Sequence, residues 1–155
     1  MSGDDLPLSL TLHDEQGVEV DAARLQDMAR RVAAAEGATG EISLLLVDAP
    51  RIAELNAEFL GGTGPTDVLA FPVDGLVTHA AAAGPPVLIG EIVLCPEVAV
   101  QQAPAGSDGL GAELDLLVAH GVLHLLGYDH DTEDHAASMR RREEAACGRS
   151  GARAT

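Results

Sequence analysis

Apolar residues recur along this chain at two spacings, one typical of strands and one of helices. Residues 6–12 alternate weakly between apolar and polar side chains, and residues 42–47, 68–73 and 87–94 contain short apolar runs. Alternation and short runs of this length are typical of half-buried and fully buried strands. The pattern therefore predicts about four strands.

Between these runs, apolar residues lie three and four positions apart, which is the spacing along one helix face. The longest such stretch, residues 110–126, predicts a helix with a broad buried face. Residues that commonly begin helices mark four more starts: Asp21, Asp48, Pro96, and either Asp131 or Thr132. About five helices with about four strands predict an α+β fold around one mixed sheet.

Length and composition fit one domain. The chain has 155 residues, of which 46% are hydrophobic, and a chain of this size buries roughly 68–70% of its unfolded surface. We expect a single domain over residues 1–147 and a disordered tail over residues 148–155. No apolar run reaches the ~18 residues of a membrane-spanning helix, and the N-terminus is acidic where a signal peptide is basic, which predicts a cytoplasmic protein without a membrane partner.

The charge balance restricts the class of partner. Twenty-five acidic residues outnumber nine basic ones, all of them arginine, and the net charge is −16. Such a surface disfavours non-specific binding of nucleic acid, so a phosphate-bearing substrate needs a local site. Cys95 and Cys147 form no metal-binding pair in the sequence and are interpreted as ordinary thiols.

The candidate chemistry lies in three histidines at the end of the long predicted helix. His120 and His124 are four residues apart, so their side chains lie on one helix face. Gly127 allows the chain to leave the helix and place His130 beside them. Three neutral imidazoles leave one position of a tetrahedral zinc open for water, which is typical of a catalytic site. The sequence therefore predicts one zinc ion per chain, held by His120, His124 and His130 at the C-terminal end of a core helix.

The sequence has three further histidines, and imidazole ligands are compatible with more than one metal. His13, His79 and His135 have no comparable neighbours and are interpreted as surface or core residues. Imidazole ligands also suit nickel and copper, so the ligand type alone does not select zinc. A bound zinc ion lowers the pKa of its water and polarises a carbonyl or phosphoryl oxygen. The three histidines thus predict a hydrolase.

The same histidine spacing occurs in zincin proteases of the type HExxHxxGxxH, where the residue after the first histidine is the glutamate that acts as general base. Here that residue is Gly121. Loss of a general base typically lowers the rate by ~10²–10⁴-fold. A metalloprotease is therefore the less favoured interpretation.

The segment at residues 120–130, HGVLHLLGYDH, resembles the signature H-G-x-L-H-L-x-G-Y-D-H of the YbeY family of bacterial metal-dependent endoribonucleases. Residues 65–72, PTDVLAFP, resemble the family's P-T-D-V-L-S-F-P, and residues 90–92 resemble its G-D-I strand. Leu55 and Asn56 match an L-N segment, and the resemblance covers roughly residues 40–147.

The resemblance implies a zinc-dependent, single-strand-specific endoribonuclease that acts in ribosomal RNA maturation and ribosome quality control. The implied partners are a ribosomal RNA precursor and the small ribosomal subunit. Three positions differ from the family pattern. Leu60 stands where many members have an arginine thought to contact the RNA backbone, Ala70 replaces a hydroxyl residue, and Glu91 replaces the commoner aspartate.

The sequence does not assign the residues that transfer protons or bind the substrate. Asp129, Glu91 and Asp67 are candidates for proton transfer, and the catalytic group is not assigned. Thr66 and Asp67 are candidates for substrate binding at the rim of the metal site, although residues of these types in a turn before a strand commonly hydrogen-bond the backbone. The arginines at 140–142 precede two glutamates, which favours a solvated, salt-bridged helix face over an RNA contact.

A second class of function is a ribosome-assembly factor with weak catalysis of its own. Its partner would be a ribosomal protein or a GTPase. The charge of −16 suits basic ribosomal proteins better than naked RNA. Retention of metal without cleavage of RNA would favour this alternative.

Overall fold

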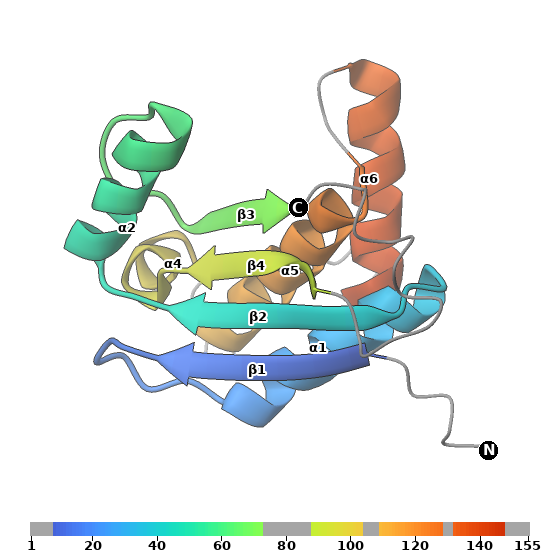
Figure 1. Cartoon of the computed structure of the whole chain (residues 1–155), viewed down its shortest axis with the longest axis horizontal. Helices are drawn as coiled ribbons and strands as arrows, with labels where there is room; N and C mark the ends of the chain where they lie inside the picture. Colours follow the sequence, from blue (N-terminus) through green and yellow to red (C-terminus); the bar gives the residue numbers. More distant parts are fainter. Residues whose placement is uncertain (1–7, 73–87, 104–108, 129–131, 148–155) are drawn as a thin grey trace.

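The computed structural model describes residues 8–72, 88–103, 109–128 and 132–147. These segments form one mixed sheet with helices on both of its faces (Figure 1). The prediction of an α+β fold in a single domain is confirmed. The predicted tail at residues 148–155 lies outside the described residues, as does His79.

The sheet has four strands in the order β1-β2-β4-β3. Their bounds are Leu8–Asp14 for β1, Gly40–Leu46 for β2, Val68–Pro72 for β3 and Leu88–Leu94 for β4. β1, β2 and β4 run parallel, whereas β3 pairs antiparallel with β4. β3 is therefore an edge strand of a mixed sheet, as Figure 1 shows.

Five α-helices and one π-helical turn are described. Their bounds are Ala22–Ala35 for α1, Ala49–Leu55 for α2, Asn56–Leu60 for the π-helix η2, Pro96–Gln102 for α4, Gly109–Leu125 for α5 and Glu133–Cys147 for α6. The Asp21 side chain accepts a hydrogen bond from the backbone N–H of Arg24, and Thr132 does the same for His135. The helix starts thus follow the capping residues in the sequence.

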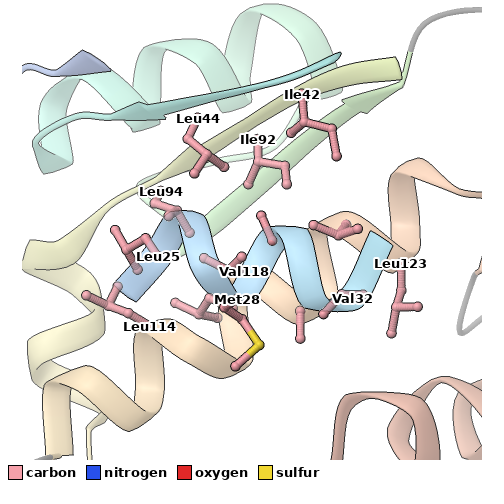
Figure 2. Packing of buried hydrophobic residues seen from close by; sticks show 14 of the residues in the cluster. Leu25, Met28, Val32, Ile42, Leu44, Ile92, Leu94, Leu114, Val118 and Leu123 are labelled. Carbon is pink, nitrogen blue, oxygen red and sulfur yellow. The ribbon is translucent and has the colours of Figure 1, made fainter. Parts of the chain in front are cut away.

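The main core lies between the sheet and the helices α1 and α5 (Figure 2). Along β2, buried and half-buried residues alternate, and Ile42 and Leu44 are fully buried toward these helices. Val118 and Leu123 of α5 belong to the same core. The apolar residues that predicted a broad face on this helix are all buried: Leu114, Leu117, Val118, Val122 and Leu125.

A smaller core covers the opposite face of the sheet. Ile52 and Leu55 of α2 pack there with Leu69 of β3 and with Val93 and Cys95 at the end of β4. The sequence did not predict the π-helical turn η2 that continues α2. This turn ends at Gly61, whose φ of 69° is the left-handed conformation that glycine adopts without strain. Within the described residues, no helix is long and apolar enough to cross a membrane.

Candidate metal centre

His120 and His124 lie in the last two turns of α5, as the spacing in the sequence predicted. Their rings are nearly parallel, with an interplanar angle of 3° and centroids 6.5 Å apart. Both rings therefore project from one helix face in the same direction. This parallel pair is the central feature of the candidate site.

The two histidines line a pocket of about 210 Å³ between the end of α5 and the edge of the sheet. One side, here called the helix wall, consists of His120, Gly121 and His124; the other side, the strand wall, consists of Leu60, Val68, Leu69 and Ala70. The helix wall carries all the ionisable groups of this lining, and the strand wall is apolar. Among the described residues, the ionisable groups that line this pocket therefore come from α5.

His120 is held from behind by a carboxylate on another helix. Oε2 of Glu143, on α6, is 2.7 Å from Nδ1 of His120. An ionised carboxylate only accepts hydrogen bonds, so opposite an ionised Glu143 the donor would be Nδ1–H of His120, and the lone pair of a neutral ring would be on Nε2. Such carboxylate–histidine pairs commonly orient histidine ligands of metals. Sequence reasoning missed Glu143, although its spacing of four from the apolar Met139 places both on one face of α6.

His124 has a buried nitrogen without a hydrogen-bond partner among the described residues, namely Nδ1. Buried polar atoms are almost always partnered, so an unpartnered imidazole nitrogen beside a second, braced imidazole fits a metal-binding pair. No third His, Cys, Asp or Glu joins these two to form a metal-binding group within the described residues. His130 and Asp129 lie outside them, so the role of His130 as third ligand stays a prediction.

Gly121 packs directly against the sheet. A Cβ atom at this position would lie 3.0 Å from Cγ2 of Ile92 on β4, and Gly121 itself is buried. Any side chain in its place would press its Cβ against Ile92 in the core. The position that carries the general base in HExxH proteases is thus a packing position here, and the protease interpretation loses its key group for a structural reason.

The turn after α5 is fixed by three polar side chains. Gly127 has a φ of 104°, and the hydroxyl of the next residue, Tyr128, donates to Oε1 of Glu36 over 2.7 Å. Arg142 donates to Oε2 of the same carboxylate over 3.0 Å and lies over the Tyr128 ring. The hydrogen bond to Glu36 raises the pKa of Tyr128 above its ordinary value of 10.0. For Arg142, the interpretation of the basic run as a salt-bridged face is supported.

Asn56 organises the glycine-rich loop beside the strand wall. The side-chain amide of Asn56 donates to the backbone carbonyl oxygen of Gly64 over 3.0 Å. The backbone carbonyl oxygen of Asn56 accepts from the N–H of Gly62, also over 3.0 Å. A Cβ atom on Gly62 would lie 2.5 Å from the Asn56 amide, so a side chain there would displace the amide from its present place. These contacts hold the end of η2, where Leu60 stands 56% exposed at the pocket.

Thr66 and Asp67 lie at the entrance to β3 and are not part of the described pocket lining. The Thr66 hydroxyl donates to Oδ1 of Asp67 over 3.4 Å, and the carbonyl oxygen of Asp67 accepts from the N–H of Cys95 over 2.9 Å. These contacts fit the structural interpretation of a held strand entrance. Substrate binding by the two residues stays a prediction.

Glu91 is on the wrong side of the sheet for proton transfer at the histidines. Side chains alternate between the faces of a strand, and Ile92 belongs to the core beneath α5. Glu91 therefore shares the opposite face with Val93, and it pairs in register with Phe71, which also packs on that face. The candidacy of Glu91 for proton transfer is not supported. His13 and His135 are exposed, as expected of surface histidines.

Comparison with known proteins identifies the family. A family model described as Endoribonuclease YbeY matches residues 10–151. Endoribonuclease YbeY of Salinispora tropica is 46% identical over 140 residues, covering 85% of this chain and 89% of that protein. The same enzyme of Mycobacterium tuberculosis is 42% identical over 137 residues, covering 85% of this chain and 77% of that protein.

A solved structure agrees with these sequence matches. The solution structure of TM1509 from Thermotoga maritima superimposes with a TM-score of 0.56 at 26% identity, covering 91% of this chain and 89% of that one. The family model alone matches most of the chain. The chain therefore belongs to the YbeY family of endoribonucleases, which are hydrolases that act on RNA.

Proposed function

We propose that this protein is a zinc-dependent endoribonuclease that cleaves single-stranded segments of ribosomal RNA precursors and acts in ribosome quality control. The observation that carries the proposal is the parallel pair His120 and His124, one ring braced by a carboxylate and both facing one pocket. Membership in an endoribonuclease family supplies the substrate class. The proposed place of action is the cytoplasm.

The residues proposed to hold one zinc ion per chain are His120, His124 and His130. A zinc ion bound there would polarise a phosphoryl oxygen of the substrate and lower the pKa of its bound water. Glu143 keeps Nδ1 of His120 occupied, so that ring can bind only through Nε2. Gly121 lets α5 approach β4 closely, which places the imidazoles at the edge strand where an extended substrate can reach them.

The pocket is suited to a single strand because it opens at the sheet edge beside an exposed apolar rim. Phe59 and Leu60 are 58% and 56% exposed, and Leu60 lines the pocket. Unpaired bases offer apolar faces, whereas paired bases are stacked inside a duplex. Thr66 and Asp67 lie at the entrance of β3 and are proposed to contact the RNA beyond the pocket lining.

The test is elemental analysis of the purified protein together with cleavage of a ribosomal RNA precursor, with and without small ribosomal subunits. We expect one zinc ion per chain and cleavage confined to unpaired segments. Metal affinity should fall in acid, because protons compete for the imidazole nitrogens. Zinc-loaded protein that leaves every single-stranded substrate intact would refute the enzymatic proposal.

The same experiment separates a second candidate function. The charge of −16 and the exposed Phe59 and Leu60 also suit docking onto a basic ribosomal protein or a GTPase. An assembly factor of this kind would bind metal and ribosomal components without cleaving RNA. Binding to small subunits that is unchanged by loss of zinc would favour it.

A further inference from the structure

Glu143 is one of three buried acidic side chains in the described part of the chain, with Glu113 and Asp115. Its side chain is 11% exposed, and its contact to His120 joins residues 23 positions apart. Moving a carboxylate out of water is costly unless hydrogen bonds compensate for the lost hydration. The contact with His120 must therefore account for the burial of the Glu143 carboxylate.

The helix that carries Glu143 packs along the end of α5 (Figure 1). Met139 and Glu143 are the residues of α6 that are buried, and they are four positions apart on one face. Met139 contributes to the main core. Glu143 thus occupies a place on the buried face where packing alone would favour an apolar residue, and it meets an imidazole there.

A second buried carboxylate shows how this fold joins helices when no imidazole is involved. Both carboxylate oxygens of Asp115 on α5 accept hydrogen bonds from the guanidinium group of Arg24 on α1, Oδ1 from Nε over 3.0 Å and Oδ2 from Nη2 over 2.7 Å. This pair has the planar, two-bond geometry that suits arginine and a carboxylate. Glu143 instead contacts one nitrogen of a histidine that lines the pocket. Helix joining alone does not account for that choice of partner.

We infer that Glu143 is a positioning residue for the metal centre: it holds His120 in the tautomer protonated on Nδ1 and fixes the ring's orientation. The inference rests on the proposed zinc site. No carboxylate accepts a hydrogen bond from the His124 ring within the described residues. The two histidines therefore differ, and the helix that follows the histidine motif completes the site from outside the motif.

The chemistry predicts a graded response to substitution. Glu143→Ala removes the acceptor, so His120 can change tautomer and rotate, and loss of such partners typically weakens metal binding by about 10–100-fold. Glu143→Gln keeps a carbonyl oxygen that can accept from Nδ1–H but lacks the charge that raises ligand basicity. We expect Glu143→Gln to lie between wild type and Glu143→Ala. Glu144→Gln, one residue further along α6, is the control for the lost charge.

Two measurements test the inference. Competition with a zinc chelator gives the affinity of each variant, and nitrogen-15 NMR of the histidine rings in metal-free protein reports the tautomer of each imidazole. Wild type should show one histidine fixed as the Nδ1–H form, identified by its absence in His120→Gln. Glu143→Ala should lose that signal and bind zinc at least tenfold more weakly, whereas Glu144→Gln should match wild type.

The outcomes distinguish positioning from mere packing. If Glu143→Ala folds but keeps wild-type zinc affinity and tautomer, the inference is overturned, and the proposed function still stands. If Glu143→Ala fails to fold, Glu143→Gln decides: partial affinity with the Nδ1–H form retained supports positioning, and unchanged affinity overturns it. Wild-type protein that binds no zinc overturns the proposed function and this inference together.

Discussion

The helix wall and the strand wall of the pocket are built on different principles. His120 on the helix wall is backed by a buried carboxylate, and the turn beyond it is tied to α1 and α6 through Glu36. The strand wall ends in Leu60, which is 56% exposed and carries no charge. One wall is polar and fixed by several helices, and the other is apolar and open.

This difference separates two tasks. Metal ligands must be held in a narrow range of geometry, which requires support from rigid elements and from hydrogen bonds behind each ligand. Contact with a flexible single strand tolerates an adaptable apolar surface. The helix wall therefore has the features of a site for chemistry, and the strand wall those of a site for substrate.

His124→Ala should abolish stoichiometric metal binding. Removing one of three protein ligands leaves too few for a stable site, so zinc content should fall from about one ion per chain to near zero. The control is His13→Ala, since His13 is exposed on β1. Elemental analysis after gel filtration measures the result. Full zinc content in His124→Ala would show that the helix wall is not the metal-binding wall.

Gly121→Glu should destabilise the fold without creating a protease. The new side chain would meet Ile92, so overpacking and burial of a carboxylate should together lower the free energy of unfolding by about 3 kcal/mol or more. Gly17→Glu is the matched control, because nothing lies within 4 Å of a Cβ placed on Gly17. Urea unfolding measures stability, and casein digestion measures peptide hydrolysis. A stable Gly121→Glu protein would contradict the close packing of α5 on β4.

Tyr128→Phe should cost about 1.5 kcal/mol near neutral pH, since it removes a hydrogen bond to a charged acceptor, Glu36. That bond favours the protonated hydroxyl, so the pKa of Tyr128 is raised above 10.0 in the folded state. The contribution of this hydrogen bond to the free energy of unfolding is complete below the unfolded-state pKa of tyrosine. It is lost as the pH rises through the raised pKa of Tyr128 in the folded state. The stability gap between wild type and variant should therefore close in strong alkali.

The chain contains one tyrosine, so the absorbance of tyrosinate reports on Tyr128 alone. Folded protein should ionise at higher pH than urea-unfolded protein. Equal midpoints in the two states would show that Glu36 does not hold the hydroxyl, and the turn after α5 would then lack its proposed support.

Most of the fold was predictable because local signals and packing agree. Asp21 and Thr132 cap helices as their side chains suggest, and the five apolar residues that predicted a broad face on the long helix are all buried. The π-helical turn η2 was not predictable, since the apolar spacing of α2 gives no sign of a change in helix type. The contacts of Asn56 with Gly62 and Gly64 hold its end, and apolar spacing does not report such contacts.

The site was only partly predictable. The spacing of His120 and His124 is local to one helix, so the sequence contains it in full. Glu143 and Glu36 approach the site from other helices, and nothing in a single sequence pairs them with His120 or Tyr128. Glu91 was a candidate because it is a carboxylate in the segment that resembles the family's G-D-I strand, whereas strand alternation places it on the face opposite the histidines.

The smallest expected effect concerns the strand wall, where Leu60→Arg should raise cleavage of free single-stranded RNA by up to about tenfold, which corresponds to about 1.4 kcal/mol of barrier. Cleavage of a phosphodiester concentrates negative charge on phosphate oxygens, and a guanidinium group can donate to two of them at once. Leu60 borders the pocket and supplies no charge, in a protein whose overall field repels RNA.

The control for this prediction is Val100→Arg, which adds the same charge at an apolar residue of α4 that is 49% exposed and is not part of the described pocket lining. A general gain from reduced repulsion would appear in both variants and fade together with added salt, because salt screens long-range charge. A gain through phosphate contact should be larger in Leu60→Arg and persist at higher salt. Small ribosomal subunits should narrow the difference in cleavage rate between wild type and Leu60→Arg. Basic groups of the ribosome then supply the positive charge that the strand wall lacks. If Leu60→Arg, fully loaded with zinc, cleaves no faster than Val100→Arg, the strand wall does not face the scissile phosphate, and the exposed apolar rim is better explained as a docking surface for protein.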